Sequence, residues 1–260
     1  MTNNLDSFSM DFFSLKGKVA IVTGGNTGLG QAYAVALAKA GADLVIPAHG
    51  NNWDETRKLI EKEGRQVAFV QGDLTNKEDR KNIVKIAMGV YGKIDILVNN
   101  AGTIRRAPLL EYAEEDWNAV MDINLNALYF LSQDVAKIMA EQGHGKIINV
   151  ASMLSFQGGK FVPSYTASKH GVVGVTKAFA NELASKNIQV NAIAPGYIKT
   201  ANTEEIRSDE KRNAEILSRI PAERWADPFD LMGAIVFLAS RASDYVNGHV
   251  LAVDGGWLAR

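Results

Sequence analysis

Short apolar runs alternate with longer amphipathic stretches along the whole chain. The run 18–23 is apolar, rich in β-branched residues and closed by glycine, which is typical of a buried parallel strand. Residues 29–40 are rich in alanine and are followed by Gly41, so this stretch is expected to form a helix. Six further runs share the features of the first and are also expected to be strands: 43–48, 66–71, 94–98, 146–151, 188–194 and 249–253.

Between these runs, apolar residues recur with the period of a helix. Val172, Val175, Phe179 and Leu183, for example, would share one face of a helix. Strand and helix alternate throughout, which predicts an α/β fold: a doubly wound, parallel, seven-stranded sheet with helices on both faces. No repeat or low-complexity linker divides the chain, so a single domain is expected.

Two segments stand outside this alternation. Residues 1–13 are expected to be a flexible tail ahead of a domain that covers 14–260. The segment from about 197 to 225 is polar and charged and is flanked by Pro195 and Pro221. Its length and composition predict a mobile lid over a binding site.

Composition narrows the choice of function. The net charge of -1 gives no long-range attraction to nucleic acid or to an anionic membrane, so neither is an expected partner. There is no apolar run of about 18 residues and no signal-peptide pattern, which predicts a cytoplasmic protein. The absence of cysteine excludes disulfides and thiolate chemistry, and the four histidines show no pairing that indicates a metal site.

The first candidate for chemistry is a glycine-rich turn at 23–30, which joins the first strand to the first helix. Backbone N–H groups at such a helix start favour a pyrophosphate, and glycines let it approach. The spacing is G-x-x-x-G-x-G and not the commoner G-x-G-x-x-G. A glycine-rich loop without a ligand is the alternative interpretation of this segment alone.

The second candidate combines Ser152, Tyr165 and Lys169. Tyr165 and Lys169 are four residues apart, so on a helix they project from one face. A free phenol is a poor base near neutrality, with a pKa of about 10, and a nearby ammonium favours the phenolate. Ser152 supplies a neutral hydroxyl that can hold a carbonyl or alcohol oxygen while Tyr165 moves the proton. Together with the glycine turn, these residues predict an enzyme.

The chain resembles the short-chain dehydrogenase/reductase family, which has the NAD(P)-binding Rossmann fold, over essentially its whole length from Leu15 to Arg260. The motifs that carry the resemblance are the glycine turn, Asp73-Leu74, 99–102 (Asn-Asn-Ala-Gly), Asn124, Ser152, Tyr165 with Lys169, Pro195-Gly196 with Thr200, and 254–256. The resemblance implies that Tyr165 is the general acid/base, that Ser152 orients the substrate oxygen, and that Asn124 helps hold a water of the proton relay. It also implies that Lys169 holds the nicotinamide ribose and lowers the tyrosine pKa.

The resemblance further implies a cofactor site. Asp73 would meet the adenine amine, Asn100 and Gly102 would flank the adenosine ribose, and Thr200 would reach the pyrophosphate or the carboxamide. The full set expected to contact the cofactor is Gly24, Asn26, Thr27, Gly28, Leu29, Gly30, His49, Asp73, Leu74, Asn100, Ala101, Gly102, Tyr165, Lys169, Pro195, Gly196, Ile198 and Thr200. Two alternatives stay open: Asp73 caps the next helix, and Asn124 satisfies backbone groups at a helix kink.

The choice between NAD and NADP depends on the end of the second strand. Relatives that use NAD carry an acidic residue there, and relatives that use NADP carry arginine or lysine there or in the glycine turn. Here the stretch 46–51 and the turn position Thr27 offer neither. Because a 2′-phosphate would lack a cation, NAD is the expected cofactor, and His49 keeps NADP possible.

The substrate side is indicated by Arg105 and Arg106, which follow the 99–102 strand end. Two arginines there can clamp a carboxylate, and only one of them is expected to reach it directly. The other is expected to anchor the loop to an acidic neighbour such as Glu111 or Glu114, and a solvated surface pair is the alternative. The lid is polar and lacks the aromatic stripe expected over a lipid.

The strings 151–159, 162–169, 243–248 and 253–260 resemble those of family members that act on sugar acids in uronate breakdown. The resemblance implies a small sugar-acid substrate, held by Arg105, Arg106, Ser152, Met153, Gln157, Tyr165 and Tyr197. It also implies a homotetramer. Two other classes remain as alternatives: a catalytically silent nucleotide-binding sensor or scaffold, and a reductase of acyl thioesters.

Overall fold

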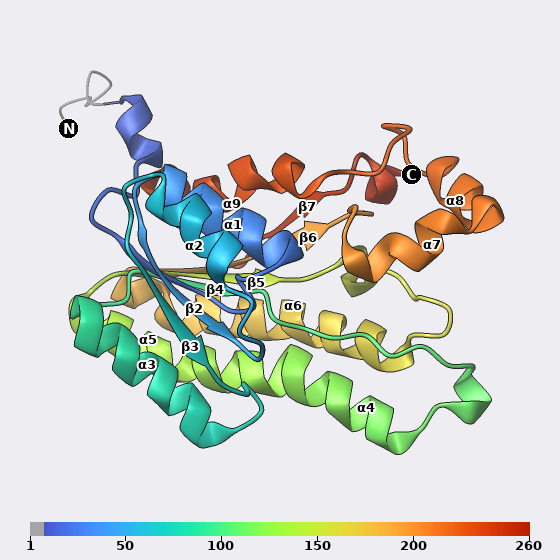
Figure 1. Ribbon diagram of the computed structural model, residues 1–260, viewed down its shortest axis with the longest axis horizontal. Helices are drawn as coiled ribbons and strands as arrows, with labels where there is room; N and C mark the ends of the chain where they lie inside the picture. The colour runs from blue at the N-terminus through green and yellow to red at the C-terminus, as the bar shows by residue number, and fades with distance from the viewer. Residues whose placement is uncertain (1–7) are drawn as a thin grey trace.

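The computed structural model describes residues 8–260, and Figure 1 shows one twisted sheet between two layers of helices. The seven strands pair in the order β3-β2-β1-β4-β5-β6-β7, and all pairs are parallel. Their bounds are β1 Val19–Val22, β2 Asp43–Ala48, β3 Val67–Gln71, β4 Ile96–Asn99, β5 Gly145–Val150, β6 Ile188–Pro195 and β7 Val250–Val253. The predicted doubly wound, seven-stranded α/β fold is confirmed.

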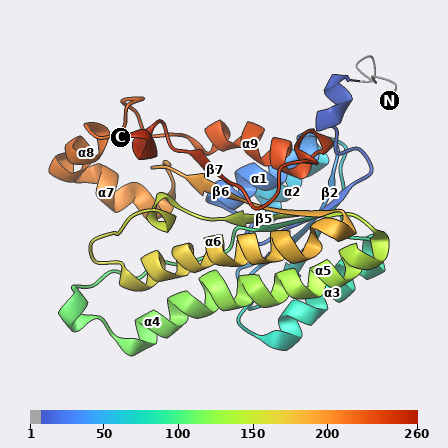
Figure 2. The same ribbon diagram turned by 180° about the vertical axis from the view of Figure 1, so that it is seen from behind.

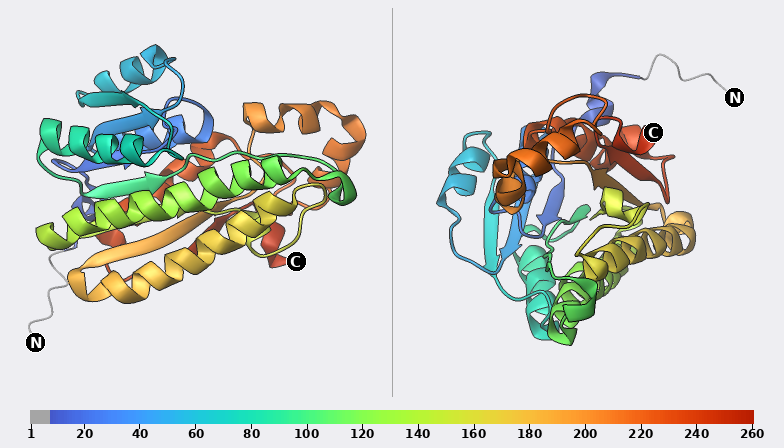
Figure 3. Two further views of the ribbon diagram at one scale, coloured as in Figure 1. Left: turned by 90° about the horizontal axis from the view of Figure 1, so that it is seen from below. Right: turned by 90° about the vertical axis from the view of Figure 1, so that its right-hand side faces the viewer.

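Helices cover both faces of this sheet. One layer holds α1 (Gly28–Lys39), α2 (Asp54–Glu61) and α9 (Met232–Ala239), and the other holds α3 (Lys77–Tyr91), α4 (Glu114–Met121), α5 (Leu128–Gln142) and α6 (Pro163–Leu183). Figure 3 shows α5 and α6 running along the same face of the sheet. Two short helices, α7 (Glu204–Ser208) and α8 (Glu210–Leu217), project at one end, beside the C-terminus (Figure 2).

Successive strand residues enter opposite layers of the core, as the period of two in a strand requires. In β1, Ala20 and Val22 pack with α1 and α9, whereas Ile21 between them packs with α3 and α5. In β2, Val45 likewise faces the layer opposite to that of its two neighbours. Both faces of β1 and β2 are therefore covered by apolar side chains, which explains why these strands are continuous apolar runs rather than alternating ones.

A buried hydrogen-bond network fixes α5 and α6 to the sheet. Asn99 at the end of β4 donates to Ser132 of α5 and to Asn149 of β5, each at 2.8 Å. Asn149 in turn donates to Thr176 of α6 at 2.9 Å. Because these polar groups are buried and satisfied, they define one placement of α6, the helix that carries Tyr165 and Lys169.

Part of the predicted tail, residues 8–13, lies within the described structure. Met10–Phe13 form a short 3-10 helix capped by Ser9, and the guanidinium of Arg241 lies 4.8 Å from the centre of the Phe12 ring. Residues 1–7 of the predicted tail lie outside the described residues. Within residues 8–260, no helix has the length and apolar character needed to cross a membrane.

Candidate active site

The glycine turn has the geometry of a phosphate cradle. Gly24 and Gly28 adopt left-handed φ angles of 63° and 54°. At Gly30 an added Cβ would lie 2.2 Å from the Gly24 carbonyl oxygen and 2.4 Å from Nδ2 of Asn100, so only glycine fits between helix and turn. At Gly28 an added Cβ would meet no protein atom within 4 Å, so this side of the turn is open. The Thr27 side chain does not cap α1, which leaves N–H groups of its first turn to bind an anion. A dinucleotide pyrophosphate fits this cradle.

The turn is held by side chains from three neighbouring elements. Asn100 donates through Nδ2 to the Thr23 carbonyl at 2.9 Å, and its backbone N–H donates to Thr23 Oγ1 at 2.9 Å. On the other side, Thr56 of α2 donates to the Asn26 carbonyl at 3.0 Å and accepts from Gln31 at 2.8 Å. Thr56 and Gln31 were not among the residues expected at the site. Their signal in the sequence is weak, since both are ordinary polar residues outside the motifs.

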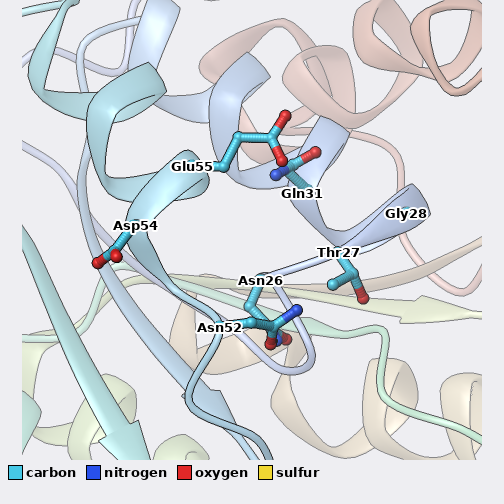
Figure 4. Close-up of a pocket in the computed structure, with 7 residues that line it drawn as sticks. All are labelled: Asn26, Thr27, Gly28, Gln31, Asn52, Asp54 and Glu55. Atoms are coloured by element: carbon cyan, nitrogen blue, oxygen red, sulfur yellow. The ribbon is translucent and has the colours of Figure 1, made fainter.

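A hollow of about 330 Å³ lies between the glycine turn and the start of α2 (Figure 4). Asn26 closes one side of it by donating to Asn52 at 2.7 Å. Asp54 and Glu55 are the charged residues of its lining, which is composed of Asn26, Thr27, Gly28, Gln31, Asn52, Asp54 and Glu55. His49 is exposed nearby at the end of β2. Two carboxylates without a lining cation disfavour an additional phosphate at this position.

Asp73 lies at the end of β3 in a compact turn. Hydrogen bonds from the Thr75 N–H and hydroxyl hold the pKa of its carboxyl below the ordinary value, and the charges of His49 and Arg80 add to the effect. The N-cap of α3 is Asn76, whose side chain accepts from the N–H groups of Glu78 and Asp79. The interpretation of Asp73 as the helix cap is therefore wrong. The neighbouring Leu74 is buried in the core layer of α3.

The catalytic candidates converge where β5 and α6 meet. Ser152 follows β5, and its hydroxyl accepts from the Leu154 N–H at 3.2 Å. Tyr165 and Lys169 share one face of α6, as predicted, and the Lys169 Nζ lies 5.5 Å from the centre of the Tyr165 ring. Lys169 is buried and donates to the Val150 carbonyl at 2.7 Å.

Burial and neighbouring groups set the pKa values of these residues. Burial raises the pKa of the Tyr165 hydroxyl, while a hydrogen bond with Ser152 and the positive charge of Arg106 act to lower it. Lys169 donates to a backbone carbonyl, and burial lowers its own pKa to about 8. That Lys169 lowers the tyrosine pKa stays a prediction.

Asn124 lies in a π-helical segment, Asp122–Ala127, between α4 and α5. Its amide accepts from the Thr103 N–H at 2.8 Å and donates to the Thr103 carbonyl at 3.0 Å and to Ser168 at 3.2 Å. It thus satisfies backbone groups, but those of Thr103 in the loop after β4 and not those of the irregular helix itself. Gly102 lies so close that an added Cβ would be 2.9 Å from Oδ1 of Asn124. Both amide hydrogens are used, so a relay water would bind to a remaining lone pair or to the backbone carbonyl.

Arg105 and Arg106 take different directions. Nε of Arg105 lies 3.4 Å from a carboxylate oxygen of Asp116 on α4, so one arginine does pair with an acidic neighbour, which is Asp116 and not Glu111 or Glu114. The chain passes through a 3-10 turn at Leu109–Glu111 before α4 begins, and this places Asp116 rather than either glutamate beside Arg105. Arg106 has an exposed side chain whose charge acts on Tyr165. Of the two, Arg105 is engaged by a carboxylate of the protein.

The predicted lid is helical and has an aromatic base. The ring of Tyr197 packs edge-on against Trp225 and Trp257, with ring centres 5.1 Å and 4.9 Å apart. Met153, next to Ser152, packs in the same cluster as Ile216 of α8. This aromatic cluster was not foreseen, because Trp257 comes from the C-terminal end of the chain.

The other expected residues of this region surround the cluster. Ile198 is buried, whereas Gln157 and Thr200 are partly exposed. Thr200 caps the short 3-10 helix Ala201–Thr203 at the start of the predicted lid. Gly196, directly after Pro195 of β6, approaches Asp254 so closely that an added Cβ would be 2.6 Å from its Cα. Within residues 8–260, no group of three or more His, Asp or Glu side chains is placed to hold a metal ion.

The fold and the site define a dinucleotide-dependent oxidoreductase, and comparison with known proteins identifies the class. A family profile described as "Enoyl-(Acyl carrier protein) reductase" matches residues 24–258. The chain belongs to the short-chain dehydrogenase/reductase family of NAD(P)-dependent oxidoreductases.

Three individual proteins illustrate the similarity. The 2-dehydro-3-deoxy-D-gluconate 5-dehydrogenase of Bacillus subtilis (strain 168) is 57% identical over 96% of this chain and 98% of its own length. A putative 2-deoxy-D-gluconate 3-dehydrogenase from Agrobacterium tumefaciens, solved with bound NADP, is 54% identical with a TM-score of 0.87 over 95% of this chain and 99% of the other. A gluconate 5-dehydrogenase from Burkholderia cenocepacia J2315, solved with NADP and tartrate, is 37% identical with a TM-score of 0.92 over 96% and 98%.

Proposed function

We propose that the protein interconverts a secondary alcohol and a ketone on a sugar acid. The proposed pair is 2-dehydro-3-deoxy-D-gluconate and 3-deoxy-D-glycero-2,5-hexodiulosonate, in the breakdown of uronates. The observation that carries the proposal is Arg106, an exposed cation whose charge acts on the candidate proton donor Tyr165. The similarity to enzymes named for this substrate supports it.

The cofactor is proposed to bind along the carboxyl edge of the sheet. The glycine turn would hold the pyrophosphate, Asp73 the adenine, and Lys169 the nicotinamide ribose. When bound, the nicotinamide supplies or accepts the hydride. NAD is the proposed preference because Asp54 and Glu55 line the hollow beside the turn without a cation. The neighbours solved with NADP make NADP the alternative.

Tyr165 is proposed to move the proton. Its raised pKa keeps the hydroxyl protonated near neutrality, which suits proton donation to the oxygen of a ketone. In the opposite direction the tyrosine must accept the alcohol proton, and both the Ser152 hydrogen bond and the charge of Arg106 favour the phenolate needed for that step. Ser152 would hold the reacting oxygen in place.

Arg106 is proposed to bind the substrate carboxylate. A guanidinium presents paired N–H groups that match the two carboxylate oxygens. Because Arg105 is engaged with Asp116, Arg106 is the arginine left to do so. Met153, Gln157 and Tyr197 are proposed to line the remainder of the substrate site.

Gluconate 5-dehydrogenase (5-keto-D-gluconate reductase) activity is the second candidate. It is favoured by the likeness to the Burkholderia cenocepacia enzyme, whose complex with tartrate contains a hydroxy acid. The paired arginines do not separate the two substrates, because both are carboxylates. A silent nucleotide-binding sensor or scaffold is disfavoured, since Asn124, Ser152, Tyr165 and Lys169 are all present.

A panel of substrates tests the proposal. Purified protein would be assayed at 340 nm with NAD⁺ and NADP⁺ on 2-dehydro-3-deoxy-D-gluconate and gluconate, and with NADH and NADPH on 5-keto-D-gluconate. The proposal predicts the highest kcat/KM on 2-dehydro-3-deoxy-D-gluconate with NAD⁺. A higher value on the gluconate pair would favour the second candidate, and inactivity on every acid would contradict both.

We further propose a cytoplasmic homotetramer. Dependence on a nicotinamide dinucleotide supports a cytoplasmic location. Partly exposed Trp117 on α4 and Phe130 on α5, next to the Asn124 segment, provide apolar surface for association. Light scattering after gel filtration would give about four times the chain mass, and a monomer would contradict this assembly.

A further inference from the structure

Tyr112 joins the Arg106 loop to the catalytic helix. It is a half-buried residue between the 3-10 turn Leu109–Glu111 and α4. Its hydroxyl lies 2.5 Å from Oγ of Ser164 and 3.3 Å from the carbonyl oxygen of Arg105. Ser164 is fully buried on α6 and directly precedes Tyr165. One side chain therefore contacts both the residue before Arg106 and the residue before Tyr165.

The direction of these hydrogen bonds follows from their partners. A carbonyl oxygen only accepts, so the single proton of the Tyr112 hydroxyl is donated to Arg105. Tyr112 must then accept from the hydroxyl of Ser164. The result is an ordered chain of donors from α6, through Tyr112, to the backbone of the substrate loop.

Both peptide groups that flank Arg106 are fixed in this way. A peptide is planar, so a hydrogen bond to the Arg105 carbonyl also sets the orientation of the Arg106 N–H. On the other side, the Ala107 N–H donates to the Phe161 carbonyl at 3.1 Å. Phe161 and Ser164 belong to the same short segment that leads into α6. The backbone around Arg106 is thus held on one side by Tyr112, which is bonded to Ser164, and on the other side by Phe161.

We propose that Tyr112 is a positioning residue that aligns Arg106 with Tyr165. This inference rests on the proposed function, in which Arg106 binds the carboxylate. Its effect passes through the Arg105 carbonyl to the backbone of Arg106. It therefore acts mainly on the affinity for charged substrates.

The test is a double-mutant cycle with Tyr112→Phe and Arg106→Ala, assayed on the sugar acid and on its lactone or amide. Tyr112→Phe is expected to raise KM for the acid about tenfold, with kcat within about threefold. On the neutral analogue, and in the Arg106→Ala background, the same change is expected to alter KM less than about twofold. Tyr91→Phe is the matched control, because the Tyr91 hydroxyl donates to a backbone carbonyl, that of Leu44, at 3.2 Å on another part of the fold.

A second readout separates this inference from the proposed function. Hydrogen exchange followed by mass spectrometry is expected to be faster in residues 103–107 of Tyr112→Phe, and unchanged there in Tyr91→Phe. An unchanged exchange rate, or an equal rise of KM with and without Arg106, would overturn the role of Tyr112. Inactivity of the wild-type protein on every acid would instead contradict the proposed function, and the exchange measurement would still decide whether Tyr112 orders the loop.

Discussion

Lys169 places its ammonium 5.5 Å from the centre of the Tyr165 ring while donating its hydrogen bond to the Val150 carbonyl. The two residues share one face of α6, but in this state the ammonium is engaged by the backbone. Burial lowers the pKa of Lys169 to about 8, so its charge changes near physiological pH. The pKa of Lys169 therefore predicts that nucleotide affinity changes with pH.

Nucleotide affinity is expected to weaken as pH rises through about 8. A bound anionic dinucleotide favours the ammonium, so the pKa of Lys169 is higher in the complex than in the free protein. Below the pKa of the free protein, Lys169 is protonated both with and without the dinucleotide, so the Kd does not depend on pH. Above that pKa, binding must take up a proton. Calorimetric titrations with NAD⁺ between pH 6.5 and 9.5 measure this. Lys169→Met is expected to bind more weakly with a flat profile, and an equal slope in that variant would assign the effect to another group.

Arg106→Ala is expected to lower kcat/KM for the sugar acid roughly 30- to 150-fold, which corresponds to about 2–3 kcal/mol for a partly desolvated arginine–carboxylate pair. Arg105→Ala is expected to cost less than about fivefold, because it loses an exposed pair with Asp116. Both variants would be assayed on the acid and on its uncharged lactone or amide. If each substrate lost activity equally, the arginines would serve the structure of the loop and not carboxylate binding.

Gly30→Ala is expected to abolish nucleotide binding and to destabilise the fold. The added Cβ would lie 2.2 Å from the Gly24 carbonyl, so either α1 or the turn must shift. Overpacking of this kind costs about 1–3 kcal/mol. Gly89→Ala on α3 is the control, because its Cβ would meet nothing within 4 Å and alanine favours a helix. Thermal unfolding and NAD⁺ titration compare the two, and unaltered binding in Gly30→Ala would contradict the proposed cradle.

The buried carboxylate of Asp95, directly before β4, is expected to make the stability of the fold depend on pH. Burial acts to raise the pKa of its carboxyl, but hydrogen bonds from His144, Lys18 and the Val19 N–H outweigh this and hold it below the ordinary value of 3.8. A lowered folded-state pKa contributes stability above about pH 4, and that stability is lost as pH falls through the folded-state value.

Asp95→Asn is therefore expected to lose about 3 kcal/mol of unfolding free energy at pH 7 and to lose less on acidification than the wild type. Urea unfolding at intervals from pH 7 to pH 3 measures both. If the variant and the wild type lost the same unfolding free energy on acidification, other carboxylates would govern the acid dependence.

The strands and the glycine turn could be predicted from the sequence because their causes are local. Apolar runs such as 43–48 match β2 to the residue, and the Tyr165–Lys169 spacing places both side chains on one helix face. Strand ends elsewhere moved by one or two residues, as at β4, because pairing with the neighbouring strand decides where a ladder begins.

The partners of side chains could not be predicted, because they depend on packing between distant elements. Arg105 pairs with Asp116 because α4 begins after an additional 3-10 turn, and the pattern of charges does not predict this turn. Tyr112 gives no signal either, as a single tyrosine outside any motif is compatible with many environments. Trp257 reaches the lid only because β7 returns the chain to that end of the sheet.

Tyr165→Phe tests the central claim most directly, namely that the Tyr165 hydroxyl moves the proton in an NAD(P)-linked reaction of a sugar acid. Phenylalanine keeps the ring packing but cannot carry the proton. The measurement is kcat on 2-dehydro-3-deoxy-D-gluconate, with the Kd for NAD⁺ determined in parallel. The account predicts that kcat falls at least about a thousandfold while the Kd changes less than about threefold. A kcat within tenfold of the wild type would contradict it.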